Sequence, residues 1–136
     1  MGYMTNGLSF RTLREANKKR LSAPAYRKAE AWITAQWMQA LVGEVGELAN
    51  ILKKIDRGDF DPVTAQDSVA NELADIQCYL DLLAHKLGVD LGEATKLKFN
   101  EVSDRINSPV YIGDDDDWHY SNLHSKPPFS TEGESK

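Results

Sequence analysis

The sequence has little cysteine and no long apolar run, and each absence excludes a class of protein. Cys78 is the single cysteine, which excludes an intrachain disulfide and a zinc site made of several cysteines. No run of about 18 apolar residues is present, and residues 1–9 lack the basic and apolar stretches of a secretory signal. We therefore expect a cytoplasmic protein that does not bind membranes.

The chain also lacks an excess of basic residues. It has 16 Lys and Arg residues against 21 Asp and Glu residues, which gives a formal net charge of −5 at pH 7. Broad binding to nucleic acids or anionic membranes draws on basic surface, so neither partner is expected. A ligand that carries phosphate groups would need a metal ion in its site.

Glycine and proline are nearly absent from two long stretches, in which apolar residues recur every three or four positions. This period is typical of helices, so we predict an all-α fold of the four-helix-bundle type over residues 1–108. The expected helices run from the N-cap Ser9 to about Leu21, from between Tyr26 and Thr34 to near Gly58, from between Asp61 and Ser68 to Gly88, and from Leu91 to Ile106.

Residues 109–136 differ in composition from the rest of the chain. They are rich in Asp, Ser, Pro and Gly and include four consecutive aspartates, Asp114 to Asp117. Such a composition predicts an irregular acidic tail rather than a second domain. Its aromatic residues are unusual for a disordered segment, so we expect part of the tail to pack on a neighbouring subunit.

Two pairs of carboxylates stand at three-residue spacing on two of the expected helices. Glu44 and Glu47 form the first pair, and Glu72 and Asp75 form the second. Residues three apart share a helix face, and both pairs lie beside apolar positions that face the core. Helices joined by a short connection pack as neighbours, so we expect the four side chains to converge in a partly buried space.

Converging carboxylates require a cation. Like charges raise one another's pKa, and burial of one unpaired carboxylate costs several kcal/mol. All the ligands are oxygens, with no Cys and no well-placed His, which favours Mg²⁺, with Mn²⁺ as a substitute, over Zn²⁺. A di-iron centre is excluded because its Glu-x-x-His motif is missing. A single Glu-x-x-Glu is usually a solvated helix surface, but a second pair on another helix favours the metal site.

The segments around these acids resemble the MazG-like nucleoside triphosphate pyrophosphohydrolases. They are ALVGEVGELA at 40–49, NELADI at 71–76 and KFNEVSDR at 98–105, and the resemblance covers roughly residues 32–107. This all-α superfamily also includes dimeric dUTPases, dCTP pyrophosphatase and phosphoribosyl-ATP pyrophosphatase. Its hallmark is a Glu-x-x-Glu pair followed by a Glu-x-x-Asp pair.

The resemblance implies cleavage of (deoxy)nucleoside triphosphates to the monophosphate and pyrophosphate, with Mg²⁺ held by Glu44, Glu47, Glu72 and Asp75. The implied role is house-cleaning or shaping of the dNTP pool. Phage relatives deplete one purine deoxynucleotide, so selectivity for dGTP or dATP in a host cytoplasm is a subcase. Gly43 stands where many members carry a further Glu, which leaves open the number of metal ions and the general base, for which Glu47 is one candidate.

Further residues are candidates for binding the phosphates and the base. Lys98, Asn100 and Arg105 resemble phosphate-contacting residues of the family, while the basic pair Lys53 and Lys54 follows Glu47 by about two helical turns. Tyr79 falls one turn after Asp75, where its ring can flank a base. The other candidates for base binding, for which core packing or solvent exposure is the competing interpretation, are Trp37, Trp32 and Asn17.

Four helices of this size leave the site open on one side, so we expect oligomerisation to complete the bundle. Members of the superfamily form dimers or tetramers, which predicts a homodimer or homotetramer. Two other functions remain open at this stage. One is phosphoribosyl-ATP pyrophosphatase, and the other is a non-catalytic helical module for oligomerisation or partner binding.

Overall fold

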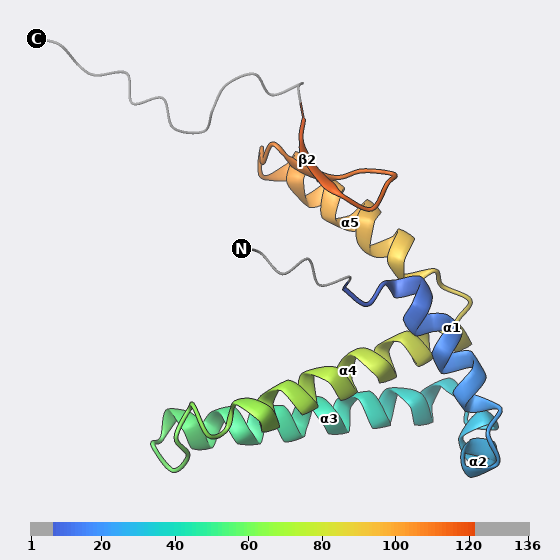
Figure 1. Ribbon diagram of the computed structural model, residues 1–136, viewed down its shortest axis with the longest axis vertical. Coiled ribbons are helices and arrows are strands. Elements are labelled where there is room, and N and C mark those ends of the chain that lie inside the picture. Colours follow the sequence, from blue (N-terminus) through green and yellow to red (C-terminus); the bar gives the residue numbers. More distant parts are fainter. Residues whose placement is uncertain (1–6, 122–136) are drawn as a thin grey trace, which may run out of the picture. The chain divides into compact units, whose positions relative to one another are not determined.

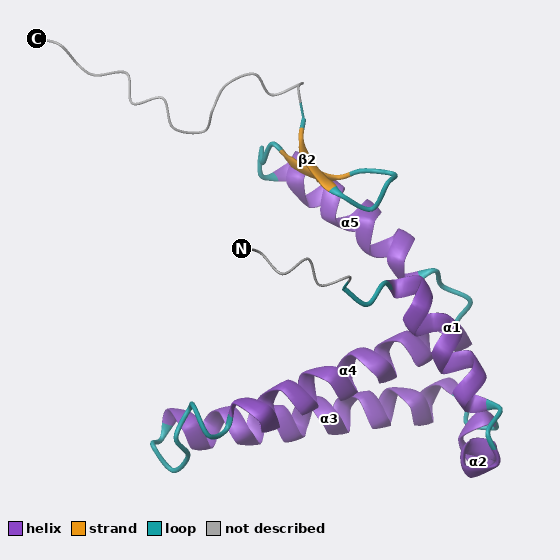
Figure 2. Ribbon diagram, in the orientation of Figure 1, coloured by secondary structure: helices purple, strands orange, loops and turns teal. Residues whose placement is uncertain are grey.

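The computed structural model describes residues 7–121, which are mostly helical (Figure 1). The helices are α1 (Phe10–Leu21), the 3-10 helix η1 (Pro24–Tyr26), α2 (Arg27–Glu30), α3 (Thr34–Asp56), α4 (Gln66–Lys86) and α5 (Leu91–Arg105). Only β1 (Val110–Ile112) and β2 (Trp118–Tyr120) are strands in this range (Figure 2). The predominance of helix among the described residues confirms the predicted all-α class. None of the described helices has the length and apolar character needed to cross a membrane.

Local sequence signals set the ends of the helices. The Ser9 hydroxyl accepts a hydrogen bond from the backbone N–H of Thr12 at 3.1 Å and so caps α1, as predicted. Gly58 and Gly88 follow α3 and α4 with φ of +80° and +69°, in the left-handed region that favours glycine. Asp61 accepts from the backbone N–H of Thr64 in the turn before α4. All four predicted helices are therefore present within a few residues of their expected limits.

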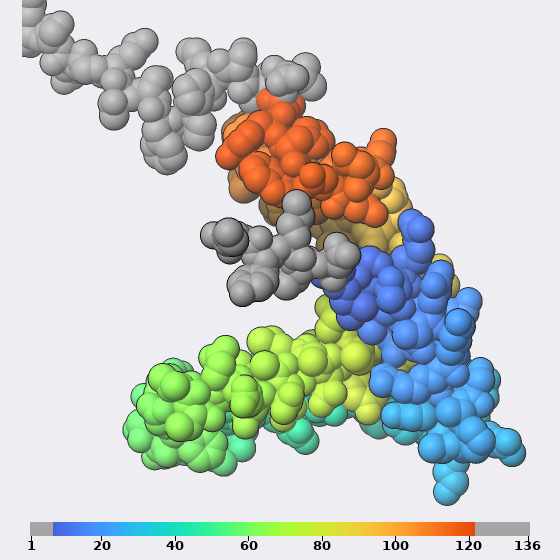
Figure 3. Space-filling view, viewed as in Figure 1, coloured from blue at the N-terminus to red at the C-terminus, as the bar shows by residue number. Residues whose placement is uncertain are grey.

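The chain divides into two compact units, of which the described parts are residues 7–91 and 92–121. This boundary differs from the one expected after residue 108, because α5 groups with the segment that follows it. In the first unit α3 and α4 pack against each other along their length, and α1 packs on α4. Its core is formed by Leu21, Trp37 and Leu82, with Trp32 and Tyr79 partly buried against them. Within this unit the α3–α4 pair, in green, extends beyond α1 and α2, in blue (Figure 3).

The second unit corrects the prediction of an irregular tail. Strands β1 and β2 form an antiparallel hairpin in which Tyr111 pairs with His119, and the acidic run lies in the connection between the strands. The amide of Asn100 on α5 bonds both the N–H and the C=O of Ile112 at 2.9 Å, and Ser103 donates to Val110 O at 2.6 Å. Side-chain anchors on α5 thus order a segment that composition alone marks as irregular. The rest of the predicted tail, residues 122–136, lies outside the described residues.

Candidate active site

Three of the four predicted acids meet between α3 and α4. Carboxylate oxygens of Glu44, Glu72 and Asp75 all lie within 4.8 Å of one another. Glu44 and Glu72 are half-buried, whereas Asp75 is exposed. Glu47 is exposed and lies outside this group, although it is close enough to act on the charge of Glu44. We call Glu44, Glu72 and Asp75 the acid triad.

The electrostatics of the acid triad are uncompensated. Burial raises the pKa of Glu44 above its usual value, and the neighbouring carboxylates of Glu47, Asp75 and Glu72 raise it further. Among the described residues, the Oε2 atom of Glu72 is buried without a hydrogen-bond partner. Within residues 7–121, none of the ion pairs that the structure shows joins the triad to a Lys or Arg. A hard cation fits this set of oxygens, since it would satisfy the orphaned atom and offset the repulsion.

A pocket of about 190 Å³ adjoins the acid triad and shares Asp75 with it. The Trp37 ring is 4.9 Å from that of Trp32 and 6.3 Å from that of Tyr79, measured between centroids. Burial and the charges of Glu44 and Asp75 raise the pKa of the Tyr79 phenol above its ordinary value. The structure places all four predicted base-binding residues in the lining, namely Trp37, Trp32, Tyr79 and Asn17.

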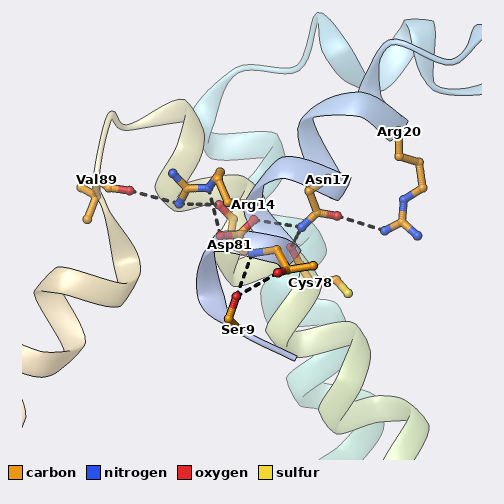
Figure 4. A network of polar contacts seen from close by, with 8 residues as sticks. Ser9, Arg14, Asn17, Arg20, Cys78, Asp81 and Val89 are labelled. Carbon is orange, nitrogen blue, oxygen red and sulfur yellow. Dashed lines mark hydrogen bonds and ion pairs between the residues drawn. The ribbon is translucent and has the colours of Figure 1, made fainter. Parts of the chain in front are cut away.

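The amide of Asn17 is already engaged within the protein. It donates to Asp81 Oδ2 at 2.9 Å and accepts from Arg20 Nη2 at 3.1 Å, while Arg14 Nε donates to Asp81 Oδ1 at 3.0 Å (Figure 4). Asp81 is 1% exposed, so this network compensates a buried charge. We call Asp81, Arg14 and Asn17 the Asp81 network. Arg20, whose guanidinium donates to the Asn17 carbonyl, also lines the pocket.

Sequence reasoning missed the Asp81 network and Arg20. One signal was available, because Asp81 interrupts the otherwise apolar run from Leu80 to Ala84 on a core helix. A charge at such a position indicates a buried pair. Nothing in the spacing of the first helix identifies Arg14 or Arg20 as the residues that meet it.

The predicted phosphate-binding pair on α3 lies apart from the acid triad. Lys53 is nine residues beyond Glu44, which corresponds to about 14 Å along a helix. Its side chain is exposed, and the Lys54 ammonium lies 4.9 Å from the centroid of the Phe60 ring. Neither lysine forms one of the ion pairs shown among the described residues.

The other predicted phosphate-binding residues lie on α5, in the second unit. Lys98 forms an exposed ion pair with Glu101 at 2.6 Å, and Arg105 is exposed. The Asn100 amide donates to the carbonyl of Ile112 and accepts from its N–H, so in this structure it holds the hairpin.

Comparison with known proteins gives one relative and no description of activity. No family model matches the chain. The chain is similar to the Gene 37 protein of Mycobacterium phage L5, with 40% identity over 79 residues that span 56% of this chain and 68% of the phage protein. With this identity over two thirds of the relative's length, the chain belongs to the family of the Gene 37 protein of phage L5.

Proposed function

We propose that the protein is a Mg²⁺-dependent pyrophosphohydrolase that converts (deoxy)nucleoside triphosphates to the monophosphate and pyrophosphate. One observation carries the proposal: the acid triad converges, with a Glu72 oxygen that has no hydrogen-bond partner among the described residues, beside a pocket lined by four aromatic side chains. The three acids of this arrangement lie in two of the segments on which the MazG-like resemblance rests. Because the relative is a phage protein, the proposed place of action is the host cytoplasm.

The chemistry of the acid triad supports a hard divalent cation. Carboxylate oxygens are the ligands that Mg²⁺ and Mn²⁺ prefer, and Mg²⁺ keeps positions open for water and phosphate oxygens. When bound, Mg²⁺ would neutralise charge on the phosphates and lower the pKa of a bound water. Glu44, Glu72 and Asp75 would hold it.

The aromatic pocket supports a nucleotide as the substrate. A volume of about 190 Å³ is below the roughly 300 Å³ at which sites for drug-sized ligands begin, so the pocket accepts one ring system rather than a whole nucleotide. Because Asp75 belongs to both the pocket and the acid triad, a base in the pocket would direct its phosphates toward the acids. Trp32 and Tyr79 would pack against the base.

Glu47 is suited to act as the general base. Its carboxylate is exposed and close enough to Glu44 to raise the pKa of that residue, yet it lies outside the acid triad. A carboxylate in this position is free to take a proton from an attacking water while the triad holds the cation.

We also propose that the active form is a homodimer or homotetramer. On α3 the apolar side chains of Met38, Val42, Val45 and Leu52 are exposed at three-, four- and seven-residue spacing, and Leu73 on α4 is exposed as well. An apolar helix stripe of this length is typical of a bundle completed by further helices. A second α3–α4 pair would supply them and give the predicted four-helix bundle.

A panel of triphosphates tests the proposed reaction. Purified protein with canonical and modified dNTPs and NTPs should release pyrophosphate only when Mg²⁺ or Mn²⁺ is present. Glu72→Gln and Asp75→Asn should abolish release, whereas Asp59→Asn, which alters an exposed carboxylate paired with Arg57, should not. Release of orthophosphate alone, or no turnover of any triphosphate, would contradict the proposal.

A further inference from the structure

A triphosphate would bring more negative charge to the site than one divalent cation offsets, because three carboxylates would already surround that cation. Enzymes that transfer phosphoryl groups add Lys or Arg side chains to the metal for this reason. The predicted lysines of α3 are poorly placed for this role, since Lys53 and Lys54 lie more than two helical turns beyond Glu44. The proposed reaction therefore needs a basic side chain nearer the acid triad.

Arg20 is a basic side chain in that position. It lines the pocket to which Asp75 of the acid triad also belongs, and it is exposed, so a ligand from solution reaches it. Burial raises the pKa of the Tyr79 phenol, the charges of Glu44 and Asp75 raise it further, and the charge of Arg20 acts against them. The guanidinium and the two carboxylates thus act on the same hydroxyl group. None of the ion pairs shown within residues 7–121 involves Arg20.

Contacts within the protein orient Arg20 and leave donors for a ligand. One guanidinium nitrogen donates to the Asn17 carbonyl at 3.1 Å, and the guanidinium carbon lies 5.7 Å from the centroid of the Tyr26 ring. Asn17 is itself held by Asp81, which takes its charge partner from Arg14 (Figure 4). A guanidinium has five N–H groups, so most of them remain for a ligand after the contact with Asn17. An oriented guanidinium suits the forked contact that Arg makes with phosphate oxygens.

A solvated side chain is the competing interpretation, because most arginines lie on protein surfaces without a ligand. Two features favour a ligand at Arg20. The residue shares a pocket with a carboxylate of the acid triad, and two neighbouring side chains hold its guanidinium. Arg11, near the start of the same helix, is exposed as well but lies outside the lining of the pocket, so it provides a matched comparison.

We propose that Arg20 is a phosphate-binding residue of this site, whose guanidinium donates to phosphate oxygens that the cation of the acid triad does not hold. The residue precedes the segment, residues 32–107, over which the MazG-like resemblance extends, so the resemblance does not assign this role. The inference rests on the proposed function, from which it takes the triphosphate and the cation.

Binding of phosphate ligands tests this role without requiring hydrolysis. The ligands are inorganic tripolyphosphate, which has no base, and the four canonical deoxynucleoside triphosphates with a methylene group in place of the oxygen between the α and β phosphorus atoms. Calorimetric titrations with excess Mg²⁺ give the affinity of each ligand for wild type and for Arg20→Gln. The variant should bind tripolyphosphate and the analogues about tenfold more weakly, the size of one charge-assisted hydrogen bond.

Three further measurements assign the loss to the guanidinium. Arg20→Lys keeps the charge but not the fork, so it should lose only about threefold. Arg11→Gln removes the same charge about 14 Å away along α1 and should bind the ligands like the wild type. Mn²⁺ alone should bind no more weakly to any variant than to wild type, which shows that the acid triad is intact. If thermal unfolding shows that Arg20→Gln does not fold, Arg20→Lys decides by a loss confined to the phosphate ligands.

The outcomes separate this inference from the proposed reaction. Equal affinity of wild type and Arg20→Gln for the phosphate ligands, an equal loss in Arg11→Gln, or a loss that extends to Mn²⁺ alone would overturn the role of Arg20. Failure of the wild type to bind any of these ligands would overturn it as well. A protein that binds the analogues through Arg20 but releases no pyrophosphate from any triphosphate would overturn the proposed reaction and leave the phosphate-binding role standing.

Discussion

Helix α4 carries two kinds of buried carboxylate, and they differ in how their charge is compensated. Asp81 is almost completely buried, and both of its oxygens accept hydrogen bonds, from Arg14 and from Asn17. Two to three turns earlier on the same helix, Glu72 has a buried oxygen with no hydrogen-bond partner in residues 7–121 and lies against Glu44 and Asp75. Hydrogen-bond partners within the described residues compensate the charge of Asp81, whereas one oxygen of Glu72 has no such partner.

The difference separates a structural role from a binding role. A buried charge with matched partners joins elements together, as Asp81 joins α4 to α1. Ionised acids without basic partners raise the free energy of the metal-free fold, and a cation that bound them would offset this cost. The same helix therefore holds a structural carboxylate toward its C-terminal end and, nearer its N-terminal end, the two carboxylates to which the proposed function assigns the cation.

The largest effect is expected at Asp81. Asp81→Ala should lower the free energy of unfolding by about 3 kcal/mol, because it leaves the charge of Arg14 and the amide of Asn17 without their partner. Asp75→Ala is the matched control on the same helix and should cost much less in metal-free protein. Urea denaturation measures both variants. Equal losses would show that the two kinds of carboxylate do not differ in role.

The next effect is on metal binding. Glu72→Gln should weaken the binding of Mg²⁺ or Mn²⁺ at least tenfold, roughly the loss seen even for residues that only support a metal ligand. Calorimetric titration with Mn²⁺ measures the affinity directly. Glu101→Gln alters an acid of the second unit that is paired with Lys98, and its affinity should match the wild type. An unchanged affinity in Glu72→Gln would remove Glu72 from the ligand set.

The pH dependence of stability sharpens the comparison further. The pKa of Glu44 in the folded protein is raised above its ordinary 4.5 by burial and by the carboxylates of Glu47, Asp75 and Glu72. Between 4.5 and this higher value the folded state binds more protons than the unfolded state, so metal-free stability should fall as pH rises through this window. Thermal unfolding of wild type against Glu44→Gln measures it. The variant should lack the fall in stability that the Glu44 carboxyl causes. In the wild type, Mg²⁺ should offset this loss of stability near neutral pH.

The smallest effect extends the comparison to the second unit. Asn100→Ala should cost about 1–2 kcal/mol of local stability, because it removes both hydrogen bonds to the backbone of Ile112. Lys98→Ala should cost much less, since its pair with Glu101 is exposed. Hydrogen exchange at the Ile112 amide distinguishes them. Similar exchange rates in the two variants would show that Asn100 does not anchor the hairpin.

The helices were predictable because their signals are local. Apolar residues at three- and four-residue spacing, the cap at Ser9 and the glycines at 58 and 88 act within a few residues of one another. The hairpin was not predictable because its strands are three residues long and depend on Asn100 and Ser103 of α5. Composition marked the aspartates as a tail, although they form the connection of an ordered hairpin.

In the candidate site, too, some positions were predictable from the sequence and others were not. Glu44, Glu72 and Asp75 were placed together by spacing alone, because three-residue spacing fixes a helix face and a short connection makes α3 and α4 neighbours. The position of Glu47 outside the triad was not predictable from its spacing, which is the same as that of Asp75 from Glu72.

The sequence by itself determined the helical class, the helix limits and the pairing of the acids, because each depends on interactions between residues close together in the chain. The tertiary structure alone decided which polar groups find partners. It joined Arg14 and Asn17 to Asp81 across more than 60 residues, and it buried the Trp37 N–H and a Glu72 oxygen with no partner in the part of the chain that the structure describes. Compensation of a buried polar group depends on contacts between distant segments, and those contacts form only when the helices pack.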